Sequence, residues 1–114
     1  MGYGPFTYFE TSIQSNVTLG SAVDLGRSWE KVYLFIPSMA SGDIFIQAAE
    51  KVDGTFKRVC VDMGNTSTAQ MDFKIPSTVT NRVVPIPSYL RFIKVESSSG
   101  TTDVTTTFRV FVGG

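Results

Sequence analysis

Apolar and polar residues alternate along most of this chain, in short runs that end at Gly, Pro, Asn, Asp or Ser. Alternation with a period of two is typical of a strand that buries one face, and turn residues mark where such strands end. No stretch has convincing helical spacing. We therefore expect about eight strands, over residues 6–13, 31–36, 43–51, 55–61, 69–75, 82–84, 89–96 and 104–112.

The turn signals recur roughly every 8–12 residues, a spacing typical of a β-sandwich, jelly roll or barrel. Neither a repeat nor a linker interrupts them, so residues 1–114 are expected to form a single all-β domain. Residues 1–9 could form an extended N-terminal arm of that domain.

Four segments allow more specific predictions. The run Lys31–Ile36 is apolar on both faces, as in a central or doubly covered strand. The dipeptide Asp53-Gly54 between two apolar runs predicts a hairpin with a type I′ turn, which needs positive φ at both central residues. Pro85-Ile86-Pro87 predicts a stiff extended crossing that cannot sit inside a sheet. Residues with alternating apolar side chains predict a half-buried strand over 69–75 and one face of the last strand, formed by Val104, Thr106, Phe108, Val110 and Val112.

Charge argues against two classes of partner. Ten basic residues balance ten acidic ones, and no run of like charge appears. Nucleic-acid binding depends largely on a basic surplus that neutralises phosphates, and anionic membranes attract basic clusters, so neither partner is expected. The first residues lack the basic and apolar regions of a signal peptide. No apolar run approaches the ~20 residues of a membrane span.

The chain has little equipment for catalysis. It contains no histidine, which removes the commonest general base and a common zinc ligand. Acidic residues are spread singly, and the glycines form neither a phosphate-binding nor a calcium-binding loop. We therefore expect no enzyme, metal or cofactor, although two distant carboxylates could still meet and act as a small hydrolase. The single cysteine, Cys60, lies between Val59 and Val61 and is expected to be a small buried apolar residue.

Aromatic residues are the main candidates for an interaction surface. They crowd the first segment, where core packing and an apolar arm that contacts a neighbouring subunit are both open interpretations. Trp29, the single tryptophan, is more typical of the core, and as a sugar platform it would need partner aromatics. The candidate assembly interface therefore consists of Tyr3, Phe6, Tyr8, Phe9 and Trp29.

The order of the segments resembles that of a known family. Asp24-Leu25-Gly26 precedes the apolar strand, Asp53-Gly54-Thr55-Phe56 follows the next strand, and Pro85-Ile86-Pro87 leads into Tyr89-Leu90-Arg91-Phe92. This succession, over roughly residues 16–112, resembles the jelly-roll cement, or decoration, proteins of tailed bacteriophages.

The resemblance implies a jelly-roll-like antiparallel β-sandwich that forms a homotrimer on the outer surface of a phage capsid. There it would bind the major capsid protein, bridge neighbouring capsomers and stabilise the assembled lattice by mass action. The expected location is then the virion, after assembly in the host cytoplasm. Similar short motifs also occur in sugar-binding sandwiches, so a carbohydrate- or receptor-binding module of a phage tail or fibre is the alternative.

Overall fold

The alternating segments form strands throughout the described chain. The structure, a computed structural model, describes residues 7–37, 42–61, 71–98 and 105–113. These residues form nine strands and no named helix. The strands are β1 (Thr7–Ile13), β2 (Val23–Asp24), β3 (Lys31–Ile36), β4 (Ile44–Ala49), β5 (Lys57–Arg58), β6 (Lys74–Ile75), β7 (Arg82–Pro85), β8 (Phe92–Ser97) and β9 (Thr106–Gly113).

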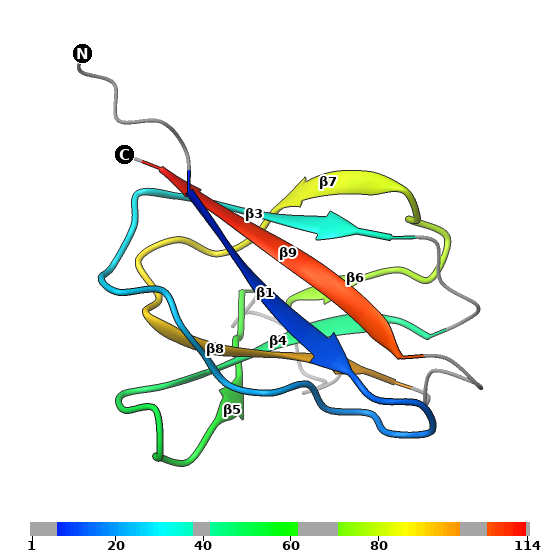
Figure 1. The fold of residues 1–114 in the computed structure, drawn as a ribbon, viewed down its shortest axis with the longest axis horizontal. Helices are drawn as coiled ribbons and strands as arrows, with labels where there is room; N and C mark the ends of the chain where they lie inside the picture. The colour runs from blue at the N-terminus through cyan, green and yellow to red at the C-terminus, as the bar shows by residue number, and fades with distance from the viewer. Residues whose placement is uncertain (1–6, 38–41, 62–70, 99–104, 114) are drawn as a thin grey trace.

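Two antiparallel sheets face each other (Figure 1). The four-stranded sheet has the order β1-β9-β3-β7, and the five-stranded sheet has the order β2-β8-β4-β5, with β6 also paired to β4. From β1 to β4, each strand lies in the other sheet from the strand before it. The same alternation resumes at β7, which lies in the four-stranded sheet, and continues through β8 and β9. Since β5 and β6 share one edge of β4, they are two pieces of one interrupted strand position. This alternation is the jelly-roll arrangement, and the expected all-β sandwich is confirmed.

The core lies between the two inner faces. Phe108 is its largest fully buried side chain, and it lies among aliphatic residues of both sheets such as Leu34, Ile46 and Val95. The predicted face of the last strand is confirmed where it is described, with these residues buried: Thr106, Phe108, Val110 and Val112. Val104 lies outside the described residues.

Strand β3 is central, as predicted, because β9 and β7 flank it. Of the two alternatives, a central or a doubly covered strand, the structure shows the first. Val32, Leu34 and Ile36 point into the core, whereas the outer side chain of Phe35 is 40% exposed. No described residue forms a layer over the outer face of this sheet, so an apolar strand face meets solvent.

The turn between β4 and β5 differs from the predicted type I′ turn. Neither Asp53 nor Gly54 has a positive φ. The Gly54 amide instead donates a hydrogen bond to the carbonyl oxygen of Lys51, at 3.1 Å, so Val52 and Asp53 are the central residues. The hairpin itself is present, because β4 and β5 pair antiparallel through a longer loop that does not need mirror-image dihedral angles.

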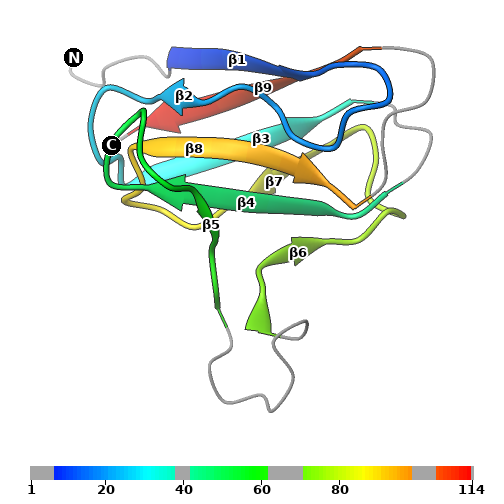
Figure 2. The same ribbon diagram turned by 90° about the horizontal axis from the view of Figure 1, so that it is seen from below.

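The predicted strand over residues 69–75 is mostly replaced by a ribbon that leaves the sandwich. The amide of Val61 donates a hydrogen bond to the carbonyl oxygen of Met71, and the amide of Phe73 donates one to the carbonyl oxygen of Val59. Residues 59–61 and 71–73 therefore pair with each other, and only β6 returns to the sheet. Figure 2 shows this ribbon running away from both sheets. Its position explains why Cys60 is exposed, contrary to the expected burial.

Two of the motifs that carry the family resemblance meet at β2 and β8. The guanidinium of Arg91 donates to both carboxylate oxygens of Asp24, at 2.9 and 3.2 Å. This contact and the amide of Gly26 lower the pKa of Asp24. The Leu25 amide donates to the Arg91 carbonyl oxygen. These residues thus fasten an edge of the five-stranded sheet, which is a structural role.

The prediction that the proline segment cannot sit inside a sheet is wrong for Pro85, which pairs with Tyr33 of β3. Pro85 ends β7, and β7 is an edge strand, so the missing amide of proline interrupts no interior ladder. The Ile86 amide then donates to the carbonyl oxygen of Val32 before the chain passes to β8.

Candidate functional site: the outer face of the four-stranded sheet

A row of apolar side chains crosses the outer face of the four-stranded sheet. The strand register pairs Tyr8 with Phe111, Phe111 with Tyr33, and Tyr33 with Pro85. Because paired residues point to the same side of a sheet, these four side chains form one line across β1, β9, β3 and β7. We call this line the aromatic row. The rings of Tyr8 and Phe111 have centroids 5.6 Å apart, within the range of favourable aromatic pairs.

A second row lies beside the first and is half charged, half apolar. The register pairs Glu10 with Arg109, Arg109 with Phe35, and Phe35 with Val83. Arg109 Nε lies 3.2 Å from Glu10 Oε2, so the charges at the β1 end compensate each other. At the other end, a shallow hollow of about 390 Å³ is lined by Tyr33, Phe35, Val83 and Phe111.

The face is apolar and open to solvent. Tyr8 is 52% exposed and Val83 is 54% exposed. Isolated exposed apolar residues are ordinary on protein surfaces, but contiguous apolar patches mark interaction sites. Here the apolar residues are contiguous, since each lies opposite the next in the strand register and four of them line one hollow. We therefore take the aromatic row with Phe35 and Val83 as the candidate functional site.

The outer face of the five-stranded sheet also carries aromatic residues, but cationic side chains cover them. The guanidinium carbon of Arg58 lies 3.8 Å from the ring centroid of Phe45, and that of Arg91 lies 4.8 Å from Phe92. Lys94 Nζ lies 4.5 Å from the centroid of Phe56. Each cation keeps contact with water while its stem shields the ring, so this face is adapted to solvent.

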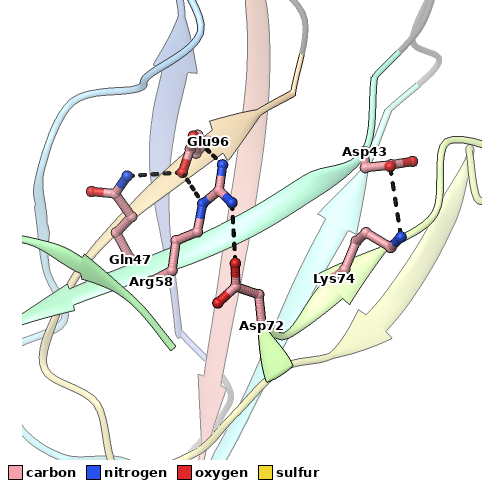
Figure 3. Close-up of polar contacts among 6 residues, drawn as sticks. All are labelled: Asp43, Gln47, Arg58, Asp72, Lys74 and Glu96. Carbon is pink, nitrogen blue, oxygen red and sulfur yellow. Dashed lines mark hydrogen bonds and ion pairs between the residues drawn. The ribbon is translucent and has the colours of Figure 1, made fainter. Parts of the chain in front are cut away.

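Arg58 is the centre of a polar network on that covered face (Figure 3). Its Nε and Nη2 donate to the two carboxylate oxygens of Glu96, at 3.0 and 2.8 Å, and its Nη1 donates to Asp72 at 3.1 Å. The side-chain amide of Gln47 donates to Glu96 as well, at 2.8 Å. Because Asp72 belongs to the ribbon and Glu96 to β8, Arg58 holds the base of the ribbon against the sandwich.

Hydrogen bonds in this network fix the charge of its members. The hydrogen bond from Arg58 is the main cause that lowers the pKa of Glu96, and Gln47 adds to it against the opposing effect of burial. The same hydrogen bond raises the pKa of Arg58. Asp72 and Glu96 are thus two carboxylates from distant segments that do meet, as a small hydrolase would require. Since the hydrogen bonds from Arg58 and Gln47 favour Glu96 as the anion, Glu96 is poorly suited to be a general acid.

The residues proposed from the sequence divide into three groups. Tyr8 lies in the aromatic row. Phe9 and Trp29 are half-buried and pack against the core. Tyr3 and Phe6 lie outside the described residues, whereas Thr7–Phe9, which the sequence analysis included in a possible arm, belong to β1.

Trp29 is covered on more than one side. Its indole Nε1 donates to the carbonyl oxygen of Leu25 at 2.6 Å, and the guanidinium carbon of Arg27 lies 3.9 Å from its ring centroid. A sugar-stacking platform needs an open aromatic face. The contacts of Trp29 therefore favour its interpretation as a core residue.

Sequence reasoning missed Tyr33, Phe35, Val83 and Phe111. A signal for them was present, because β3 is apolar at every position after Lys31, and Phe111 interrupts the polar face of the last strand. That signal indicates apolar residues on an outer face. It does not reveal whether another layer of the same chain covers them.

The described residues show little other binding chemistry. They contain no group of three or more Cys, Asp or Glu side chains at metal-binding spacing. Within the same residues, no helix has the length and apolarity of a membrane span. Comparisons of the chain with protein-family models, curated proteins and solved structures return no match.

Proposed function

We propose that this chain is a virion structural protein, a capsid decoration protein that binds the outer surface of a phage head and stabilises its lattice. The single observation that carries the proposal is the contrast between the two outer faces. One face shields its aromatic residues with Arg58, Arg91 and Lys94. On the other face Arg109 lies farther from its ring, 5.5 Å from the Tyr8 centroid, and Tyr8, Phe35 and Val83 stay 52%, 40% and 54% exposed. An exposed apolar face on an otherwise charged sandwich is suited to covering by a protein partner.

The size of the face fits a weak contact repeated many times. With four strands ~4.8 Å apart and two rows of side chains each ~6.6 Å deep along the strands, the face covers roughly 250 Å². Stable pairwise complexes bury about 800 Å² on each partner, so one such face binds weakly. On a lattice of identical sites, the small free energy of each contact stabilises the assembled form only, and simultaneous contacts by linked copies strengthen it.

The charge balance and the fold support the same proposal. With ten residues of each sign, dense packing of copies creates little self-repulsion. The motifs that resemble those of decoration proteins lie at the paired edge of β2 and β8 and at the β4–β5 hairpin. The resemblance also implies a homotrimer, which a mass measurement on capsid-bound protein would test.

The test is decoration of capsids from the phage that encodes the chain. Purified protein is mixed with unexpanded procapsids and with expanded empty capsids, and both are imaged by electron cryo-microscopy. The proposal expects regular added density on expanded capsids, at three-fold or quasi-three-fold positions. Failure to decorate either form would overturn it. Binding to a glycan array without decoration would favour the receptor-binding alternative.

A further inference from the structure

The four edges of the two sheets differ in how they are protected against pairing with other strands. Strand β7 is four residues long and contains Pro85, and β2 is two residues long. Strands β5 and β6 are two residues each and carry Lys57, Arg58 and Lys74. Short length, proline and exposed charge are the devices by which proteins block sheet edges. Among the described strands, these three edges are therefore poor sites for pairing.

Strand β1 is the exception. It has seven residues, contains no proline, lysine or arginine, and pairs residue for residue with β9 without a bulge. Its second half is covered, because Thr11 Oγ1 donates to the carbonyl oxygen of Ser21 and the backbone at Gly20 approaches Thr11 and Ser12. Its first half, residues 7–10, makes no backbone hydrogen bond on the outer side with another described residue. Among the described residues, no strand pairs with this side of β1 over residues 7–10.

We infer that this open edge of β1 binds the same edge of a second copy, antiparallel across a two-fold axis. Because the other described edges are blocked, the best available partner for β1 of one copy is β1 of a second copy. Charge permits the contact, since Glu10 is the one charged residue in β1 and its own Arg109 compensates it. The two four-stranded sheets then join into one, with Tyr8 of each copy beside the axis.

The contact extends the candidate site. Tyr8 ends the aromatic row at the β1 edge, so pairing two edges brings two aromatic rows end to end. The combined face has twice the area of one copy, which strengthens a contact that is weak alone. This inference adds to the proposed function and does not depend on it, because the edge pairs whether or not the face binds a capsid.

The experiment measures mass and proximity together. Sedimentation equilibrium of the unchanged protein gives the mass over a wide concentration range, with 12.5 kDa expected for a monomer. Single cysteines are then placed on the edge, as Thr7→Cys, Tyr8→Cys or Glu10→Cys in a Cys60→Ser background, and treated with a short bifunctional thiol reagent. Val52→Cys is the control, because Val52 and Tyr8 are both 52% exposed and Val52 lies in the β4–β5 turn.

We expect the mass to double with rising concentration, and the edge cysteines to form covalent dimers several-fold faster than the control. A protein that stays monomeric, with edge cysteines no faster than Val52→Cys, would overturn the inference. So would a trimer whose edge cysteines do not cross-link, since a three-fold contact uses different surfaces. Circular dichroism identifies any misfolded variant, and the mass of the unchanged protein needs no variant. Decorated capsids without edge cross-links refute only the pairing, whereas cross-links without decoration refute only the proposed function.

Discussion

Removing Arg58 should destabilise the protein more than removing an ordinary surface charge. The residue combines a two-point hydrogen bond to Glu96, a third bond to Asp72 and a stacked contact with Phe45. Hydrogen bonds to charged groups contribute about 1.5–3 kcal/mol when buried, and exposed ion pairs about 0.2–1 kcal/mol. The side chain of Arg58 is 38% exposed and that of Glu96 16%. After this discount for solvent screening, we expect a coupling of about 1–1.5 kcal/mol.

The full cost of Arg58→Ala is larger than the coupling. Truncation also uncovers the ring of Phe45, and a cation stacked on an aromatic ring adds about 0.5–1 kcal/mol. The sum is about 2 kcal/mol, which for a domain of this length lowers the melting temperature by roughly 8 °C. Urea unfolding followed by Trp29 fluorescence and by far-ultraviolet circular dichroism measures the free energy of unfolding directly.

A double-mutant cycle isolates the pair. Arg58→Ala, Glu96→Ala and the double variant give the coupling free energy, and the same cycle on Arg91 and Asp24 is the control. The control pair has the same two-point geometry, but its side chains are 48% and 42% exposed. We expect a clearly greater coupling free energy for Arg58 and Glu96 than for the control pair, and a smaller effect of salt on it. Equal coupling in the two pairs would refute the reasoning that partial burial strengthens the Arg58 network.

Three further predictions concern pH, packing and backbone strain. The folded-state pKa of Glu96 lies below its ordinary value of 4.5, so its contribution to stability is complete above that pH and is lost as pH falls through the lowered pKa. Acid titration should show this loss in the natural protein and not in Glu96→Gln. Gly20→Ala should cost about 1–3 kcal/mol in urea unfolding, because its Cβ would lie 3.2 Å from the Ser12 carbonyl oxygen and 3.3 Å from that of Val95; an unchanged midpoint would contradict this. Tyr89 has a φ of 65° and is 65% exposed, so Tyr89→Gly should raise stability by about 0.5–1 kcal/mol by calorimetry, and a loss would show that its ring contributes packing.

Local patterns predicted most of the fold, because strand periodicity and turn residues act over short distances. The strand Lys31–Ile36 has the predicted bounds, and the last strand has the predicted inner face. The prediction of a type I′ turn at Asp53-Gly54 was wrong, because a longer loop closes the same hairpin without positive φ. The prediction that Cys60 is buried was wrong, because its segment pairs within the ribbon instead of packing on the core.

The candidate site was less predictable, since it depends on which faces remain uncovered. Apolar residues on both sides of β3 look the same in the sequence whether a second layer covers them or not. Likewise, nothing in the spacing of Arg58 and Phe45 reveals that one covers the other. Tyr8 was found because it stands in a visible cluster, whereas Phe111 lies 103 positions away in the chain and joins it only through the β1–β9 register.

The central claim is that the exposed apolar face of the four-stranded sheet binds a partner, and two matched valines test it. Val83 lies on that face and is 54% exposed, whereas Val52 lies in the β4–β5 turn and is 52% exposed. Co-sedimentation with expanded capsids gives the affinity of Val83→Lys, Val52→Lys and the natural protein. A lysine forced into an apolar contact costs at least about 1.4 kcal/mol, so Val83→Lys should bind about tenfold more weakly or worse, and Val52→Lys should bind normally. Capsid binding that is equally strong in all three proteins would contradict the account.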